Sequence, residues 1–238
     1  PLYKPDWPVK HRPLDLDVHD LPHESSLIEW WYFHAHLKAA DGTPFCVFAA
    51  LFQLKIGDET LSHVHASVLL DGKRHAYYSC GEPHAAAAVA GARDPRADEY
   101  FERALMEVMA KRKLPLPDQT SAERFTVPAD AMAFDCSRLG MHKTPSGAYR
   151  VTLSADAPPA GAHGPAAGSG FGFDLLFTPT KPAVRNGIDG VSPGVGSDDA
   201  MFYYSITRMD VSGTVTRAAP AAGAAGASSS SAAGSGGP

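Results

Sequence analysis

The sequence predicts an all-β fold, an antiparallel β-barrel with one flanking amphipathic α-helix, from two observations. The first is the segment 28–36, IEWWYFHAH, whose side chains alternate between the two faces of a strand. Neither face carries ordinary solvent-facing polar residues, so we expect a core or ligand cavity on one side and a packed partner on the other. The second is a series of strand-like runs separated by glycine-containing turns, which is typical of antiparallel sheets.

The first part of the chain predicts an arm and then a β-meander. Residues 1–26 are rich in proline, histidine and aspartate and show no apolar period, which predicts an extended arm. Hairpin turn signals at Asp41-Gly42, Gly57-Asp58 and Asp71-Gly72 then separate four predicted strands: 28–36, 45–56, 61–70 and 74–80. On the first strand, Ile28, Trp30, Tyr32, His34 and His36 share one face. Glu29, Trp31, Phe33, Ala35 and Leu37 share the other.

The clearest helix signal follows Asp94 and Pro95, which suit the cap and the first turn of a helix. An apolar stripe comes next, formed by Phe101, Ala104, Leu105, Val108 and Met109. Pro115 prevents continuation. We therefore expect an amphipathic helix of about four turns against the outside or across the mouth of the barrel.

Strand signals return in the second half of the chain, at 124–127, 131–138, 148–155, 170–178 and 201–215. Residues 155–170 form a loop of small residues, whereas the loop 181–199 carries several charges. A loop so long and polar predicts a lid or the ordered edge of a site.

The domain organisation follows from these elements. We expect an arm over 1–26, one barrel domain over 27–217, and a disordered linker or tail over 218–238, which holds only alanine, glycine, serine and proline. Because linkers usually lead to another domain, we interpret the chain as the front part of a longer protein, with a natural tail as the alternative. The start at Pro1 indicates processing or a piece cut from something longer.

Composition excludes several function classes. The net charge of -5 offers no basic surface for nucleic acid. Three widely spaced cysteines predict free thiols and a cytoplasmic protein. No apolar run reaches the length of a membrane helix, and we find no phosphate-binding glycine loop or Cys-x-x-Cys pair. We expect neither a cofactor nor a metal.

Two His-x-His pairs stand on neighbouring predicted strands: His34 with His36, and His63 with His65. Converging imidazoles would bind zinc, but the favoured interpretation is histidines hydrogen-bonded within a half-polar barrel lumen. A third possibility is that His36 or His65 acts as an acid, a base or a group that orients substrate.

Glu29 stands between Ile28 and Trp30, where a carboxyl group would be poorly solvated. Such surroundings favour the protonated form and make Glu29 a candidate proton donor. The alternative, which we favour on local chemistry, is a structural glutamate paired with Arg185 or Arg208.

Several blocks in order along residues 15–216 resemble the lipocalin-like carotenoid 1,2-hydratase family. They are 21–33 (LPHESSLIEWWYF), 103–105 with 114–118, 181–182 with 187–191, and 201–205 with 211–215. The resemblance implies a pair of lipocalin-like barrels whose members hydrate or cyclise apolar polyenes and isoprenoids. The family's second barrel is replaced here by 218–238, so a second lipocalin-like domain is a possible partner.

This chemistry requires an acid, shielding for a carbocation and a positioned water. Glu29 is the candidate acid, and His36 or His65 could orient the water. The candidate ligand-contacting residues are Trp30, Trp31, Tyr32, His34, His63, Tyr203 and Arg185. A noncatalytic barrel that carries a hydrophobic small molecule is the alternative, and a purely structural barrel is a third.

Overall fold

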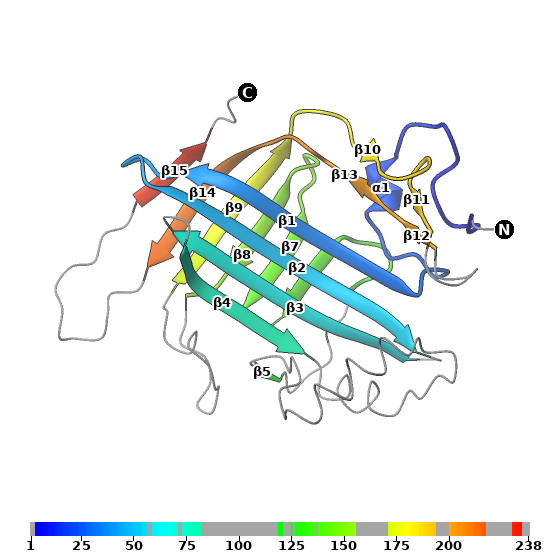
Figure 1. Ribbon diagram of the computed structural model, residues 1–238, viewed down its shortest axis with the longest axis horizontal. Coiled ribbons are helices and arrows are strands. Elements are labelled where there is room, and N and C mark those ends of the chain that lie inside the picture. The colour runs from blue at the N-terminus through cyan, green and yellow to red at the C-terminus, as the bar shows by residue number, and fades with distance from the viewer. Residues whose placement is uncertain are drawn as a thin grey trace.

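Two antiparallel β-sheets face each other across a shared core in the computed structural model (Figure 1). The structure describes residues 3–56, 59–70, 73–81, 119–120, 125, 127–136, 138–155, 171–193, 200–217 and 230–234. Nearly all regular structure in these ranges is β, which confirms the predicted fold class. The predicted helix after Asp94 and most of the loop 155–170 lie outside the described residues. No described helix has the length and apolar character needed to cross a membrane.

The first sheet has the order β1-β2-β3-β4-β5. Its strands are β1 (Ile28–Lys38), β2 (Pro44–Ile56), β3 (Glu59–Leu70), β4 (Lys73–Gly81) and β5 (Gln119–Thr120). The first four form the predicted antiparallel meander, and β5 adds parallel to β4. Gly42 adopts a positive φ of 88° in the turn after β1, where glycine tolerates the left-handed region.

The second sheet has the order β15-β14-β9-β8-β7-β6. Its strands are β6 (Ala133–Cys136), β7 (Leu139–Lys143), β8 (Tyr149–Leu153), β9 (Phe171–Pro179), β14 (Met209–Arg217) and β15 (Ser230–Gly234). Strands β8 and β9 confirm the predictions at 148–155 and 170–178. Strand β6 likewise lies within the predicted strand 131–138, but its hairpin partner β7 was not predicted from the sequence. Phe125 and Val127, within the predicted strand 124–127, lie outside any strand.

The predicted strand 201–215 divides into β12 (Met201–Phe202), β13 (Tyr204–Ser205) and β14. The division arises because the short strands bond to the preceding loop: β12 pairs with β11 (Val191–Ser192), and β13 with β10 (Val184–Arg185). Strand β14 alone joins the second sheet. The described part of the loop 181–199 is therefore ordered by backbone pairing. Gly190, with φ of 94°, permits its turn, and a Cβ there would lie 2.3 Å from the Phe202 ring.

Both chain ends carry structure where the sequence predicts none. Strand β15 lies within the predicted linker or tail 218–238, where pairing through backbone groups along β14 requires no large side chains. The predicted extended arm contains the one-turn helix α1 (Leu16–His19), capped by the Asp15 carboxylate, which accepts from the Asp17 amide at 3.1 Å. Trp7 of the arm is 4% exposed and packs against Phe202 and Val191.

The space between the sheets is filled by side chains. Phe33 of β1 contacts Tyr149 and Phe177 of the second sheet, with ring centroids 5.6 and 5.0 Å apart. The alternation predicted for β1 is confirmed, since Phe33, Ala35 and Leu37 are buried. The opposite face is not packed as expected, because Tyr32, His34 and His36 are exposed. Among the described strands no hydrogen-bonded ladder joins β1 to β14 or β15.

Candidate ligand-binding site

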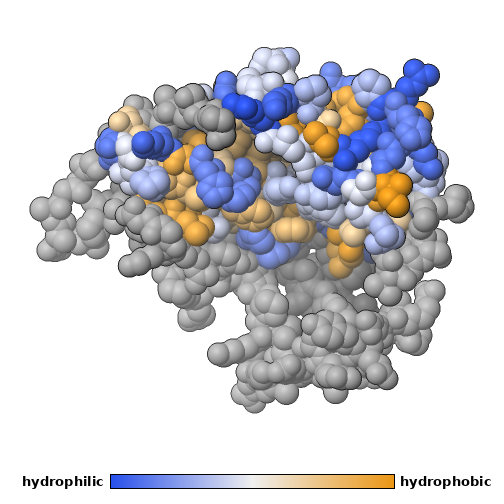
Figure 2. Space-filling model, turned by 45° about the horizontal axis from the view of Figure 1, so that its top comes forward, coloured by the Kyte–Doolittle hydropathy of each residue, from blue (hydrophilic) through white to orange (hydrophobic). Residues whose placement is uncertain are grey.

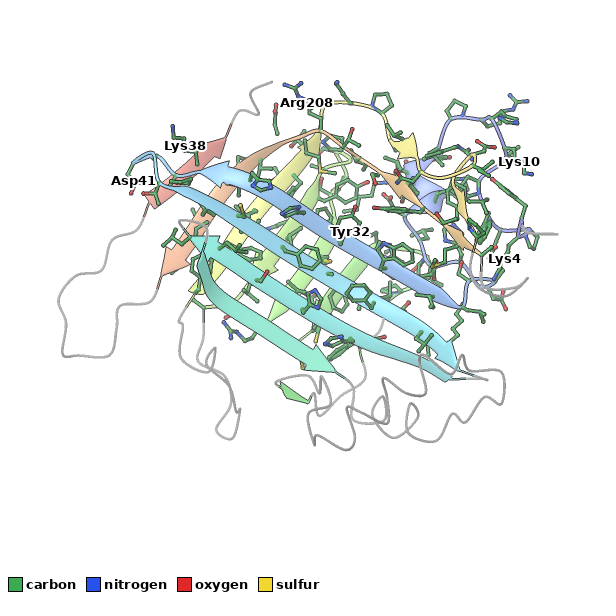
Figure 3. The ribbon with its side chains drawn as sticks, in the orientation of Figure 1. Lys4, Lys10, Tyr32, Lys38, Asp41 and Arg208 are labelled. Atoms are coloured by element: carbon green, nitrogen blue, oxygen red, sulfur yellow. The ribbon has the colours of Figure 1, made fainter. Side chains whose placement is uncertain are left out.

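A cavity of about 990 Å³ lies along β1, between this strand and the segment 202–211. Its position follows from the topology, because among the described strands β1 is an edge strand whose one ladder partner is β2. The other edge of β1 faces the segment that leads through β13 into β14, and both faces of β1 contribute side chains to the walls. Figure 3 shows Tyr32 in the middle of β1. A cavity of this volume is typical of small-molecule sites.

The walls are rich in aromatic rings. Trp31, Phe33, Tyr149, Phe177, Phe202 and Tyr204 all line the cavity. On the outward face of β1, Trp30 packs on Tyr203 with ring centroids 5.6 Å apart. The Tyr32 and Tyr203 hydroxyl oxygens are 2.7 Å apart, so this hydrogen bond bridges β1 to the facing segment. Burial, and then the hydrogen bond to Tyr203, raise the pKa of Tyr32.

A buried carboxylate, Asp20, anchors a polar cluster at the arm end of the cavity. Asp20 is 4% exposed and directly follows α1. Its Oδ2 accepts from the Tyr149 hydroxyl at 2.6 Å and lies 2.9 Å from the Lys143 Nζ. Its Oδ1 accepts from the Tyr204 hydroxyl. The Trp31 indole donates to the Asp20 carbonyl at 2.7 Å. Side chains from β7, β8 and β13 therefore converge on one carboxylate of the arm.

The cluster fixes the protonation states of its members. Burial, followed by the nearby Asp20 charge, raises the pKa of Tyr149 and of Tyr204, so both phenols stay protonated donors. Burial opposes the charge of Lys143, but hydrogen bonds to Asp17 and Asp20 together raise the pKa of its ammonium group. The arrangement is a buried ion pair whose remaining acceptor positions are filled by phenols.

Glu29 forms the second polar pair, with His23 of the arm. Glu29 Oε1 accepts from the His23 amide at 2.9 Å and lies 2.9 Å from His23 Nδ1, while Oε2 accepts from the same amide at 3.0 Å. Both side chains are nearly buried, at 12% exposed for His23 and 11% for Glu29. Glu29 is therefore a paired glutamate, as the favoured interpretation held, but its partner is His23 and not Arg185 or Arg208.

Two imidazole nitrogens of this end have no hydrogen-bond partner among the described residues. They are His19 Nδ1 and His23 Nε2, and both atoms are shielded from solvent. The two rings are stacked, with centroids 6.1 Å apart and planes inclined by 10°. Burial, and then the neighbouring His23, lower the pKa of His19. Because a buried unpaired nitrogen is unfavourable, these two atoms are positions where a polar group of a ligand would be stabilised.

The arm brings these histidines to the cavity through contacts along its whole length. Arg185 donates to the carbonyls of Val9 and Arg12, both at 2.7 Å, and contacts the Phe202 ring at 5.4 Å. The Lys143 Nζ donates to the Leu16 carbonyl at 2.7 Å, which fixes the start of α1. Arg185 was expected to contact ligand, but it does not line the cavity and instead holds the arm.

The structure brings together part of the predicted site. Glu29, Trp30, Trp31, Tyr32, His34, His36 and Tyr203 line the cavity. His63 and His65 do not line it, because β3 lies two strands away from the cavity edge of β1. The three candidate catalytic residues do not converge, since Glu29 points to the opposite face of the sheet from His36 and His65.

The second His-x-His pair instead belongs to the outward face of the first sheet. By register, Trp30, Phe52 and His63 stand in one row, and Tyr32, Ala50 and His65 in the next. His65 contacts the Phe48 and Phe52 rings at 5.0 and 5.4 Å. Burial, and then the nearby His65, lower the pKa of His63 to about 4. Over the described residues no group of three or more His, Cys, Asp or Glu side chains is placed to hold a metal ion.

Sequence reasoning missed most of the polar cluster. His19, Asp20 and His23 lie in the predicted arm, and Lys143 lies on the missed strand β7. The available signal was the histidine and aspartate content of the arm directly before the aromatic strand. This composition indicates polar residues close to the strand in sequence, but it does not indicate that the arm folds back over the strand.

Two facing antiparallel sheets with an aromatic cavity at their seam define a lipocalin-like protein. The chain belongs to the AttH-like family, whose model matches residues 8–228. A crystal structure of a candidate AttH from Nitrosomonas europaea has a similar fold, with a TM-score of 0.54 at 16% sequence identity. The similarity covers 94% of this chain and 54% of that chain, so the chain spans about half the length of that protein. No curated protein matches the chain.

Proposed function

We propose that this chain binds an elongated apolar small molecule, of the isoprenoid or polyene kind, in the cavity along β1. The observation that carries the proposal is the cavity itself, about 990 Å³ with aromatic walls and a polar cluster at one end. Binding sites for small molecules combine such apolar walls with a few polar groups that fix orientation. No disulfide joins Cys46, Cys80 and Cys136, which supports a reducing, cytoplasmic compartment as part of this proposal.

The walls suit a long unsaturated chain. Trp31 and Phe33 line the inner side and Tyr32 the outer side of the same strand, so a ligand lying along β1 meets rings over much of its length. Burying apolar surface stabilises such a complex by about 25 cal/mol per Å².

Acid-initiated addition to a C=C bond, as in a hydratase or cyclase, is the second candidate function. The Glu29–His23 pair favours this second function, because a carboxyl group and an imidazole 2.9 Å apart can exchange a proton, and both line the cavity beside Trp30 and Trp31. In this step a proton from the pair adds to one alkene carbon, the aromatic walls shield the cation on the other, and water adds there. The proton that the water releases returns to the pair.

Titrating the protein with retinol and farnesol tests binding, read as quenching of tryptophan fluorescence for retinol and by calorimetry for farnesol. Trp31→Ala should weaken binding at least tenfold, because it removes a ring from the inner wall. Incubation with both alcohols and with acyclic carotenoids, followed by mass spectrometry, tests for products heavier by one water molecule. Product formation that Glu29→Gln abolishes while binding persists supports catalysis, whereas binding without product supports carriage alone. Absence of saturable binding to any of these compounds contradicts the proposal.

A further inference from the structure

We propose that the ligand of this cavity is an amphiphile with an anionic head group, which binds at the end of the cavity bounded by Lys38 and Arg208. The inference rests on the proposed function and names the class of ligand more narrowly. The structure offers two chemically different ends to any elongated molecule: histidines and carboxylates line one end, and Lys38 with Arg208 lines the other.

The charges that line the cavity are separated along β1. Glu29 stands near the start of the strand, close to Asp20. Lys38 is its last residue, nine positions further on, which at a strand rise of roughly 3.3 Å per residue is about 30 Å away. Arg208 lies directly before β14 and also lines the cavity. Figure 3 shows Lys38 and Arg208 on the side of the molecule away from Lys4 and Lys10, which mark the arm.

Lys38 differs from the carboxylates of the arm end in its partners. At the arm end each carboxylate already has a cationic or hydrogen-bonding partner, Lys143 for Asp20 and His23 for Glu29. At the other end the Lys38 ammonium group forms no hydrogen bond or ion pair with the described residues. Asp41, in the turn after β1, accepts from the Thr43 amide at 2.9 Å and does not line the cavity.

This distribution orients a charged amphiphile. At the arm end the nearby cation, Lys143, is already held by Asp17 and Asp20, whereas Lys38 and Arg208 at the other end attract an anionic head. Its apolar tail then lies along the rings on both sides of β1. Because both cations are exposed, the head can keep part of its hydration and the preference depends on ionic strength. Figure 2, which brings the upper side of Figure 1 forward, shows hydrophilic and apolar residues interleaved over the described part of this side.

Retinoate and retinol form a matched pair of probes, since they share a polyene tail and differ in the charge of the head. We expect retinoate to bind more tightly, and we expect Lys38→Gln and Arg208→Gln each to reduce that preference by about fivefold, the effect of an exposed ion pair. Raising the salt concentration should reduce it in the unmodified protein and have little effect in the double variant. Lys10→Gln is the matched control, because it removes the same charge at an exposed position outside the cavity.

The outcomes separate the two proposals. If neither retinoid binds saturably, the proposed function fails and this inference fails with it. If retinol binds as tightly as retinoate, or if the preference for retinoate survives in the double variant, the cavity still binds apolar molecules but the anionic class of ligand is wrong. Melting temperatures of the exposed variants should match that of the unmodified protein, which excludes misfolding as the cause of lost binding.

Discussion

Replacement of Asp20 by asparagine should reveal how strongly the arm is coupled to the two sheets. The substitution keeps the size of the side chain and removes its charge. It leaves the Lys143 ammonium group, 14% exposed, without its buried partner, and it weakens the hydrogen bonds from the Tyr149 and Tyr204 hydroxyls. Asp17 remains 2.9 Å from Lys143, so the lysine is not left wholly unpaired.

The magnitude follows from the burial of the pair. Removing one partner of a buried ion pair costs about 3–5 kcal/mol, and a hydrogen bond to a charged group contributes about 1.5–3 kcal/mol. Since Asp17 offsets part of the loss and asparagine can still accept one phenol, we expect Asp20→Asn to lower the free energy of unfolding by about 3 kcal/mol. Asp17→Asn removes the other carboxylate at the same distance from Lys143, but Asp17 is 89% exposed, so little change is expected.

Urea unfolding followed by circular dichroism and by tryptophan fluorescence measures both variants under one protocol. Asp20→Asn should shift the midpoint strongly with an unchanged slope, whereas Asp17→Asn should barely shift it. Equal shifts for the two variants would refute the reasoning, because they would show that burial does not decide the strength of the Lys143 contacts.

Two further predictions concern pH and backbone conformation. Burial holds His63 neutral in the folded protein, with a pKa of about 4 against 6.5 for an exposed histidine, so the unfolded chain takes up the proton first as pH falls. The free energy of unfolding should therefore be unaffected by His63 above about pH 6.5 and should decline as the pH falls toward 4. Melting temperatures of His63→Phe measured over this range should decline less steeply. A pH profile identical to that of the unmodified protein would contradict the role of His63. Gly190→Ala should cost about 1–3 kcal/mol, because φ is positive and the new Cβ meets the Phe202 ring; a neutral effect on the melting temperature would contradict this contact.

The sequence predicts the first sheet well because two simple signals agree there. Alternation over 28–36 defines the two faces of β1, and glycine-containing turns separate the strands of the meander. The prediction is wrong at 201–215, where the residues look equally strand-like but their hydrogen bonds go to three different partners. Long-range pairing of that kind leaves no local signature.

The faces of β1 show a second limit of the sequence. Two histidines and two large rings lie on one face, and a glutamate with two large rings on the other, so composition did not identify the inner face. Packing decided it: Phe33 meets Phe177 of the second sheet, and the His34 face turns outward. The polar cluster was equally hidden, because Asp20 becomes buried only through contacts with Lys143 and Tyr149, more than 120 positions away along the chain.

The position of the cavity at the edge of β1 separates residues that stabilise the fold from residues that would bind ligand. Leu51, opposite Trp31 on β2, is 1% exposed and does not line the cavity, so Leu51→Ala should cost about 2–5 kcal/mol and leave retinoid affinity in the folded protein unchanged. Trp30 lines the cavity and contacts Tyr203, so Trp30→Ala should weaken binding at a smaller cost in stability. If both variants lose affinity to the same extent, the ligand lies in the core between the sheets, and the seam is not its site.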